Sequence, residues 1–241
     1  MISSTLGERA VIIAGAAGGL GSVATSAFAE AGAKLVLLGR DQGKLDELAT
    51  QLKLPSAKTL VLAVDLGKPR EVDDAATAIL KKFGRIDVLL NFVGGWIGGK
   101  GIFETNKEDF DSMLDQHLNA SYAMIRSFVP PMIKGKWGRV LAVTSPNASK
   151  PPGNNSPYAV GKSAMEALML SLAQELKGTG VTANLLMVRM IDAAHERQIN
   201  PSEKNQGWTS PEEISATLLH FCSDEAGMIN GARIPLYGEP Y

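Results

Sequence analysis

The chain has 241 residues, of which 45% are hydrophobic and 20% charged, and its formal net charge is −1. This length and composition predict one globular α/β domain with a sizeable core, and the balanced charge gives no support to a nucleic-acid or membrane-surface role. No apolar run is long enough to span a membrane, and the single cysteine, Cys222, has no partner for an internal disulfide. The first residues carry no basic targeting region, so we expect a cytoplasmic protein without nucleic-acid or membrane partners.

Short, continuously apolar segments alternate along the chain with longer segments of helical periodicity. The predicted strands cover residues 10–14, 34–38, 59–64, 88–91, 140–144, 181–186 and 232–236. The predicted helices cover residues 20–30, 42–51, 71–83, 107–133, 159–176 and 211–222. Strands of this kind are buried on both faces of a parallel sheet, and the alternation predicts right-handed βαβ crossovers. We therefore expect a single Rossmann-type doubly wound α/β domain over residues 1–241, with a mostly parallel seven-stranded sheet flanked by helices.

A glycine-rich turn joins the first predicted strand to the first predicted helix. Gly15, Gly19 and Gly21 lie where a tight turn, a close approach of the backbone to pyrophosphate and helix–strand packing are needed. The amino terminus of the helix offers unpaired N–H groups to phosphates. A merely flexible turn is the alternative, but its position after the first strand favours phosphate binding.

The second predicted strand ends about twenty residues later, where the ribose of a bound dinucleotide is usually recognised. Gly39 leaves space there, Arg40 can pair with a 2′-phosphate, and Asp41 is placed to cap the next helix. We therefore favour NADP(H) as the cofactor, with NAD(H) possible; a solvated surface arginine is the alternative for Arg40.

Tyr158 and Lys162 are four residues apart in a predicted helix and so lie on one face. An ammonium beside a phenol lowers the phenol pKa, which makes the tyrosine a usable proton donor and acceptor near neutral pH. Ser145 ends the strand that precedes this helix. These residues predict that a proton and a hydride move in one pocket.

The chain resembles the short-chain dehydrogenase/reductases along essentially its whole length. The resemblance rests on the glycine turn, the Asp65-Leu66 pair, the segment 91–94, and Asn119, Ser145, Tyr158 and Lys162, which occur in the order and approximate spacing of the family. It implies a catalytic set in which Tyr158 exchanges a proton with the substrate oxygen and Lys162 lowers the Tyr158 pKa. Ser145 would hydrogen-bond the substrate oxygen, and Asn119 would hold a water that relays protons through Lys162. The expected cofactor-binding residues are Gly15, Ala17, Gly18, Gly19, Leu20, Gly21, Arg40, Asp65, Leu66, Asn91, Val93, Gly94, Tyr158, Lys162 and Ile191.

The chain departs from the family after the sixth predicted strand. The usual Pro-Gly and the following Thr are replaced by Val188-Arg189 and Ala193, so a backbone group near Ile191 is left to hold the nicotinamide amide. Arg189 pairs with a cofactor phosphate or an anionic substrate, or points to solvent. The polar segment over about residues 192–209 is predicted to form a lid over the substrate.

These residues predict an NADPH-dependent oxidoreductase that interconverts a small-molecule carbonyl and an alcohol. Two alternatives stay open: an enzyme like the dihydropteridine reductases, which the segment around Trp96 resembles, and a non-catalytic dinucleotide-binding sensor. The three histidines, His117, His195 and His220, lack metal-ligand spacing, and no metal site is expected. We also expect a homo-oligomer, a dimer or tetramer. Its apolar contacts come from Met124, Phe128, Met165, Leu168 and Leu172, unless these side chains face the core.

Overall fold

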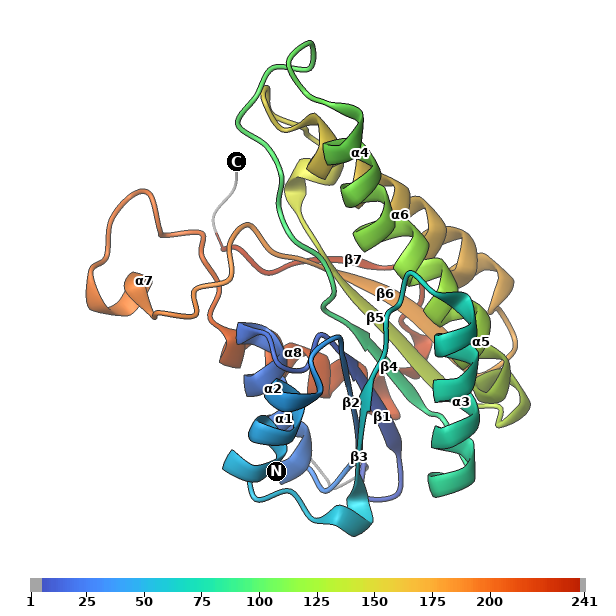
Figure 1. Ribbon diagram of the computed structural model, residues 1–241. Helices are drawn as coiled ribbons and strands as arrows, with labels where there is room; N and C mark the ends of the chain where they lie inside the picture. Colours follow the sequence, from blue (N-terminus) through green and yellow to red (C-terminus); the bar gives the residue numbers. More distant parts are fainter. Residues whose placement is uncertain (1–5, 239–241) are drawn as a thin grey trace.

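The computed structural model describes residues 6–238, and at its centre lies a parallel sheet in the order β3-β2-β1-β4-β5-β6-β7 (Figure 1). The strands are β1 (Ala10–Ala14), β2 (Lys34–Gly39), β3 (Thr59–Ala63), β4 (Val88–Asn91), β5 (Gly138–Thr144), β6 (Val181–Met187) and β7 (Arg233–Pro235). All six neighbouring pairs are parallel. The prediction of a seven-stranded, doubly wound α/β sheet is therefore confirmed. Residues 1–5, on which the expectation of no targeting region rests, lie outside the described residues.

Helices cover both faces of this sheet (Figure 1). They are α1 (Gly19–Glu30), α2 (Gln42–Gln51), α3 (Pro69–Phe83), α4 (Lys107–Leu114), α5 (Ala120–Lys134), α6 (Ser156–Glu175), α7 (Glu196–Ile199) and α8 (Pro211–Phe221). Along β1, Ile12 packs in the cluster that includes α3, α5 and α6, whereas Ile13 packs in the cluster with α1, α2 and α8. Because successive strand residues point to opposite faces, both must be apolar, and this explains the continuous apolar runs in the sequence.

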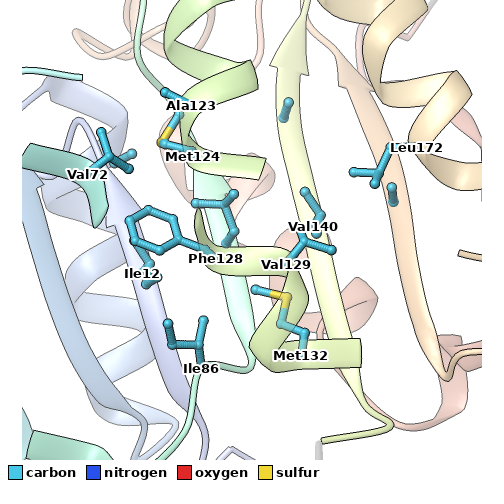
Figure 2. Packing of buried hydrophobic residues seen from close by; sticks show 14 of the residues in the cluster. Ile12, Val72, Ile86, Ala123, Met124, Phe128, Val129, Met132, Val140 and Leu172 are labelled. Carbon is cyan, nitrogen blue, oxygen red and sulfur yellow. The ribbon is translucent and has the colours of Figure 1, made fainter. Parts of the chain in front are cut away.

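The α5–α6 layer supplies side chains to the core rather than to a surface. Met124, Phe128, Met165 and Leu172 are all buried in one cluster, and Figure 2 shows Phe128 between Ile12 and the neighbouring side chains of α5. Leu168 is half-buried. The alternatives for these five residues were an oligomer interface and the core, and four of them occupy the core of the single chain.

The predicted helix over residues 107–133 is wrong in one respect. It divides into α4 and α5, joined by a π-helical turn over Asp115–Asn119. Turns of this kind insert an extra residue into a helix and change which side chains face a neighbour. The change affects the site directly, because this turn packs against α6.

The predicted lid leaves the sheet after β6, and Figure 1 shows it projecting from the body with α7 near its tip. A parallel bridge between Ile191 and Thr209 closes its base. The buried carboxylate of Asp192 accepts hydrogen bonds from the backbone N–H groups of Glu196 and Arg197, which fixes the start of α7. Arg189 stacks over the ring of Tyr237, 5.9 Å from its centroid, so its side chain packs at the base of this segment.

Across residues 6–238, the helices are too short or too polar to cross a bilayer.

Candidate active site

The glycine turn after β1 has the geometry that close backbone packing demands. Gly15 has φ +86°, a conformation that favours glycine. A Cβ on Gly21 would lie 2.1 Å from the Gly15 carbonyl oxygen and 2.6 Å from that of Ala16. The first residue before α1 is Gly18, which has no side chain to cap the helix, so the amino-terminal N–H groups are left for an anion.

A cavity of about 1040 Å³ lies beside this turn, at the carboxyl ends of the strands. Eight of the predicted site residues line it: Gly15, Gly18, Arg40, Asp65, Leu66, Val93, Gly94 and Asn119. Its size suits an extended ligand such as a dinucleotide, and in open α/β sheets ligands bind at this edge. The other predicted cofactor residues outside the catalytic group are not part of the lining: Ala17, Gly19, Leu20, Gly21, Asn91 and Ile191.

The end of β2 offers a cation and no free carboxylate to the cavity. Arg40 is exposed and lines the cavity next to Gly39. The carboxylate of Asp41 accepts a hydrogen bond from the Lys44 N–H at 3.1 Å, which confirms that it caps α2.

The ends of β3 and β4 are held by their own polar side chains. Asp65 accepts a hydrogen bond from the Gly67 N–H. Asn91 is buried, donates to Ser121 Oγ at 2.8 Å and accepts from the Val93 N–H at 3.0 Å. The Asn91 side chain therefore shapes the turn, and the backbone at Val93 and Gly94 faces the cavity.

Ser145, Tyr158 and Lys162 meet where β5 ends and α6 begins. The Lys162 ammonium donates to the Val143 carbonyl at 2.8 Å and lies 5.9 Å from the centroid of the Tyr158 ring. Ser145 is buried; its hydroxyl oxygen accepts from the Asn147 N–H at 3.2 Å, and the hydroxyl forms a hydrogen bond with Tyr158. The serine thus caps a turn and contacts the phenol at the same time.

The pKa values of this group differ from the expectation. Burial raises the pKa of the Tyr158 phenol, and the hydrogen bond from Ser145 opposes that rise. Burial also lowers the pKa of Lys162 to about 8, although the Glu166 carboxylate opposes this change. The expected lowering of the Tyr158 pKa by Lys162 is not found, because desolvation of the phenol is the larger influence.

Asn119 lines the cavity, and its expected role in relaying protons to Lys162 stays a prediction. Its side chain is exposed and donates to the Asp115 carboxylate at 2.6 Å. His117 lies at the buried group: it is 1% exposed, and its ring meets the Tyr158 ring edge-on at 5.5 Å between centroids. Sequence reasoning missed His117 because it treated the three histidines as scattered. The signal available was its place on the apolar face of the helix, four residues after Met113 and four before Ser121.

The loop that carries Trp96 is tied to the loop before α6. Trp96 Nε1 donates to Asn155 Oδ1 at 2.9 Å, and the Gly99 N–H donates to the Asn154 carbonyl. The Trp96 side chain is 62% exposed, and its bond to Asn155 holds the indole near the start of α6. Within the described part of the chain, no group of three His, Cys, Asp or Glu side chains is arranged to hold a metal ion.

A parallel sheet of this order with a glycine turn and a cavity at its carboxyl edge defines a dinucleotide-binding α/β protein. The family model for short chain dehydrogenase matches residues 9–204, and the chain belongs to this family. An uncharacterized oxidoreductase of Staphylococcus epidermidis is 29% identical over 185 residues, which are 77% of this chain and 79% of that protein. One from Staphylococcus aureus strain MW2 is 27% identical over 217 residues, 90% of this chain and 92% of its own.

Solved structures agree with this assignment. A short chain dehydrogenase from Bacillus anthracis has a TM-score of 0.86 and 25% identity, with 97% of this chain and 98% of that chain covered. An NAD⁺-bound xylitol dehydrogenase has a TM-score of 0.87 at 19% identity over 97% of this chain and 99% of its own, a likeness of fold alone. The protein is therefore an oxidoreductase enzyme of the short-chain type, a class that uses NAD(P) and acts on small molecules.

Proposed function

We propose that this enzyme reduces the carbonyl group of a small molecule to an alcohol and prefers NADPH as the reductant. The observation that carries the proposal is the grouping of Ser145, Tyr158 and Lys162 where β5 ends and α6 begins. The residues of the cavity fit a dinucleotide, because the turn around Gly15 and Gly21 brings bare backbone and a helix amino terminus to one place. The bound nicotinamide would supply a hydride, with its two electrons, to the carbonyl carbon.

The protein groups then have distinct tasks in the proposal. Tyr158, whose raised pKa keeps it protonated near neutral pH, gives its proton to the carbonyl oxygen. Ser145 holds that oxygen by a hydrogen bond and stabilises its developing charge. Lys162, still mostly charged at pH 7, stabilises the phenolate that forms and replaces its proton. A phenol that holds its proton favours the reductive direction.

The remaining cofactor residues are assigned by their places around the turn and the cavity. The phosphates would be surrounded by Ala17, Gly19, Leu20 and Gly21. The adenine would lie against Asp65 and Leu66, and the adjoining ribose against Asn91, Val93 and Gly94. The nicotinamide ribose would be bound by Tyr158 and Lys162, and the nicotinamide amide by Ile191. Arg40 is assigned to a 2′-phosphate, since Asp41 is engaged at the start of α2 and offers no carboxylate to a free 2′-hydroxyl.

We also propose that the chain acts as one catalytic domain with residues 192–209 as a lid, and that it forms a homo-oligomer. The lid proposal is supported by its origin at the carboxyl end of β6 and by its exposed apolar side chains, among them Ile199. Exposed Tyr122 on α5 and Val160 on α6 support the oligomer. A monomer in equilibrium ultracentrifugation would contradict it.

The test is oxidation of NADPH and of NADH, followed at 340 nm, with ketones, aldehydes, quinones and quinonoid pterins. We expect turnover with NADPH that Tyr158→Phe reduces by at least about 100-fold while NADPH binding, measured by fluorescence titration, is retained. Arg40→Gln should raise the KM for NADPH about tenfold and leave that for NADH unchanged, because a hydrogen bond between charged groups is worth about 1.5 kcal/mol. Equal use of both cofactors by the native enzyme would overturn the role of Arg40. Turnover confined to pterins would instead favour a dihydropteridine reductase-like enzyme, toward which the exposed Trp96 indole points.

A further inference from the structure

The His117 imidazole occupies a space that two glycines leave open. A Cβ on Gly94 would lie 2.2 Å from His117 Cε1 and 2.6 Å from Nδ1, and a Cβ on Gly161 would lie 3.0 Å from Cδ2. Gly94 belongs to the loop after β4 and lines the cavity, whereas Gly161 lies on α6 next to Lys162. The ring is therefore held between the cavity wall and the helix that carries Tyr158 and Lys162.

The hydrogen bonds of the ring define its tautomer. Nε2 lies 3.1 Å from the Gly95 carbonyl oxygen, which can only accept, so Nε2 carries the hydrogen. In a neutral imidazole the other nitrogen, Nδ1, is then an acceptor. Nδ1 is buried and has no hydrogen-bond partner among residues 6–238. A buried acceptor of this kind is costly unless a donor reaches it.

The surroundings keep the imidazole neutral. Burial lowers the pKa of His117 to about 3, the Lys162 ammonium adds to that effect, and the Gly95 carbonyl opposes it. The charged or titratable groups that bear on the ring are Lys162 and Tyr158 from α6. At neutral pH the ring is a fixed acceptor and not a source of protons.

We propose that His117 is a positioning residue of the proton path, whose Nδ1 accepts a hydrogen bond from a water molecule that resupplies Lys162 with protons from solvent. This inference rests on the proposed reductase function. In each turnover the Tyr158 O–H proton goes to the substrate oxygen, the phenolate takes a proton from the Lys162 ammonium, and the Lys162 amine takes one from the water. The water takes one from bulk solvent in turn, so one proton enters per hydride consumed and His117 itself gains none.

The π-helical turn gives this arrangement its structural cause. Because the turn over Asp115–Asn119 carries an extra residue, it places His117 inward and leaves Asn119 in solvent on the Asp115 carboxylate. The backbone carbonyl of His117 also accepts from Ser121 Oγ, the partner of Asn91. The ring is thus tied through Ser121 to the end of β4.

The first test is a ¹⁵N–¹H NMR titration of the cofactor-free protein labelled at its histidines, of which there are three. We expect the His117 signals to show the neutral Nε2–H tautomer throughout pH 5–8, with a Nδ1 shift typical of a hydrogen-bonded acceptor; the signals of half-buried His195 and exposed His220 are recorded alongside for comparison. Protonation of His117 in this range, or the Nδ1–H tautomer, would overturn the proposal.

The second test compares His117→Phe, which keeps an aromatic ring beside Tyr158 without nitrogens, with His117→Asn, which restores an acceptor. For the Phe variant we expect kcat to fall about 10- to 100-fold with little change in KM, and the solvent isotope effect on kcat to rise as proton resupply becomes limiting. The Asn variant should recover part of kcat, and His220→Phe, with its exposed ring, should behave as the native enzyme. Native kcat and isotope effect in His117→Phe would refute the proposal even if the enzyme is an active reductase. An inactive native enzyme would instead refute the proposed function and leave the NMR result to decide on His117.

Discussion

Glu166 offers the sharpest test of how this site controls charge. It lies on α6 one helical turn after Lys162, is 1% exposed, accepts from Thr144 Oγ1 at 2.7 Å and pairs with Arg233 Nη2 at 2.8 Å. Its negative charge raises the pKa of Lys162 against the effect of burial, which lowers that pKa to about 8. In Glu166→Gln the amide oxygen still accepts from Thr144 and the shape is retained, so the charge alone is removed.

The size of the effect follows from this geometry. An opposite charge about 4–6 Å away shifts a pKa by about one to three units, and since Arg233 shares the carboxylate we expect about one unit. That shift equals about 1.4 kcal/mol of preference for the charged lysine. With a pKa near 8, roughly nine-tenths of Lys162 is charged at pH 7; after a one-unit drop about half is charged.

The assay is kcat/KM for the proposed carbonyl reduction from pH 6 to pH 9.5. Because the charged lysine is the active form in the proposed mechanism, the alkaline limb should move from near pH 8 to near pH 7 in Glu166→Gln. The rate should then fall about fivefold at pH 8, about twofold at pH 7 and hardly at all at pH 6.

The control is Arg233→Gln, which removes the cation that competes for the same carboxylate and should leave the limb in place or move it to higher pH. An equal loss at every pH in Glu166→Gln would mean that the carboxylate acts on folding only. An unmoved limb, or a shift of both variants in the same direction, would refute the electrostatic argument.

Two further predictions concern glycine packing and the buried thiol. Gly21→Ala should weaken NADPH binding at least about tenfold and lower the melting temperature, because the added Cβ would meet two backbone oxygens. The control is Gly153→Ala, whose Cβ would have no atom within 4 Å. This control should leave both the melting temperature, measured by calorimetry, and NADPH binding, measured by fluorescence titration, unchanged. Burial raises the pKa of the Cys222 thiol, so a disulfide reagent at pH 8 should find no reactive thiol in the native protein and one after denaturation. Rapid reaction of the native protein would contradict the second expectation.

The sheet was predictable because its burial pattern is simple. Strands such as β1 and β4 have the predicted bounds, since every residue in them is buried. The start of β5 was missed because it contains Arg139, a charge in a strand that sequence patterns reject. Its guanidinium is buried by tertiary contacts: it stacks on Trp137 and donates to the carbonyls of Ser223 and Gly138. No pattern along the strand records those partners.

Spacing within one regular helix could be predicted from the sequence, whereas the irregular helix that precedes it in the site could not. The spacing from Tyr158 to Lys162 follows from four residues of α-helix, and the structure keeps both on one side. The helix over residues 107–133 was also predicted to be regular, and the π turn over Asp115–Asn119 breaks it.

The pKa of Tyr158 could not be predicted from the sequence for a different reason. Spacing indicates which charge lies near the phenol, but not how much solvent the surrounding loops remove. Here the removal of solvent raises the pKa of the phenol and lowers that of the ammonium, so the phenol holds its proton more tightly than the ammonium does. In the proposed reduction, a proton therefore passes favourably from the Lys162 ammonium to the Tyr158 phenolate. Burial, rather than simple charge attraction, prepares the pair for this transfer.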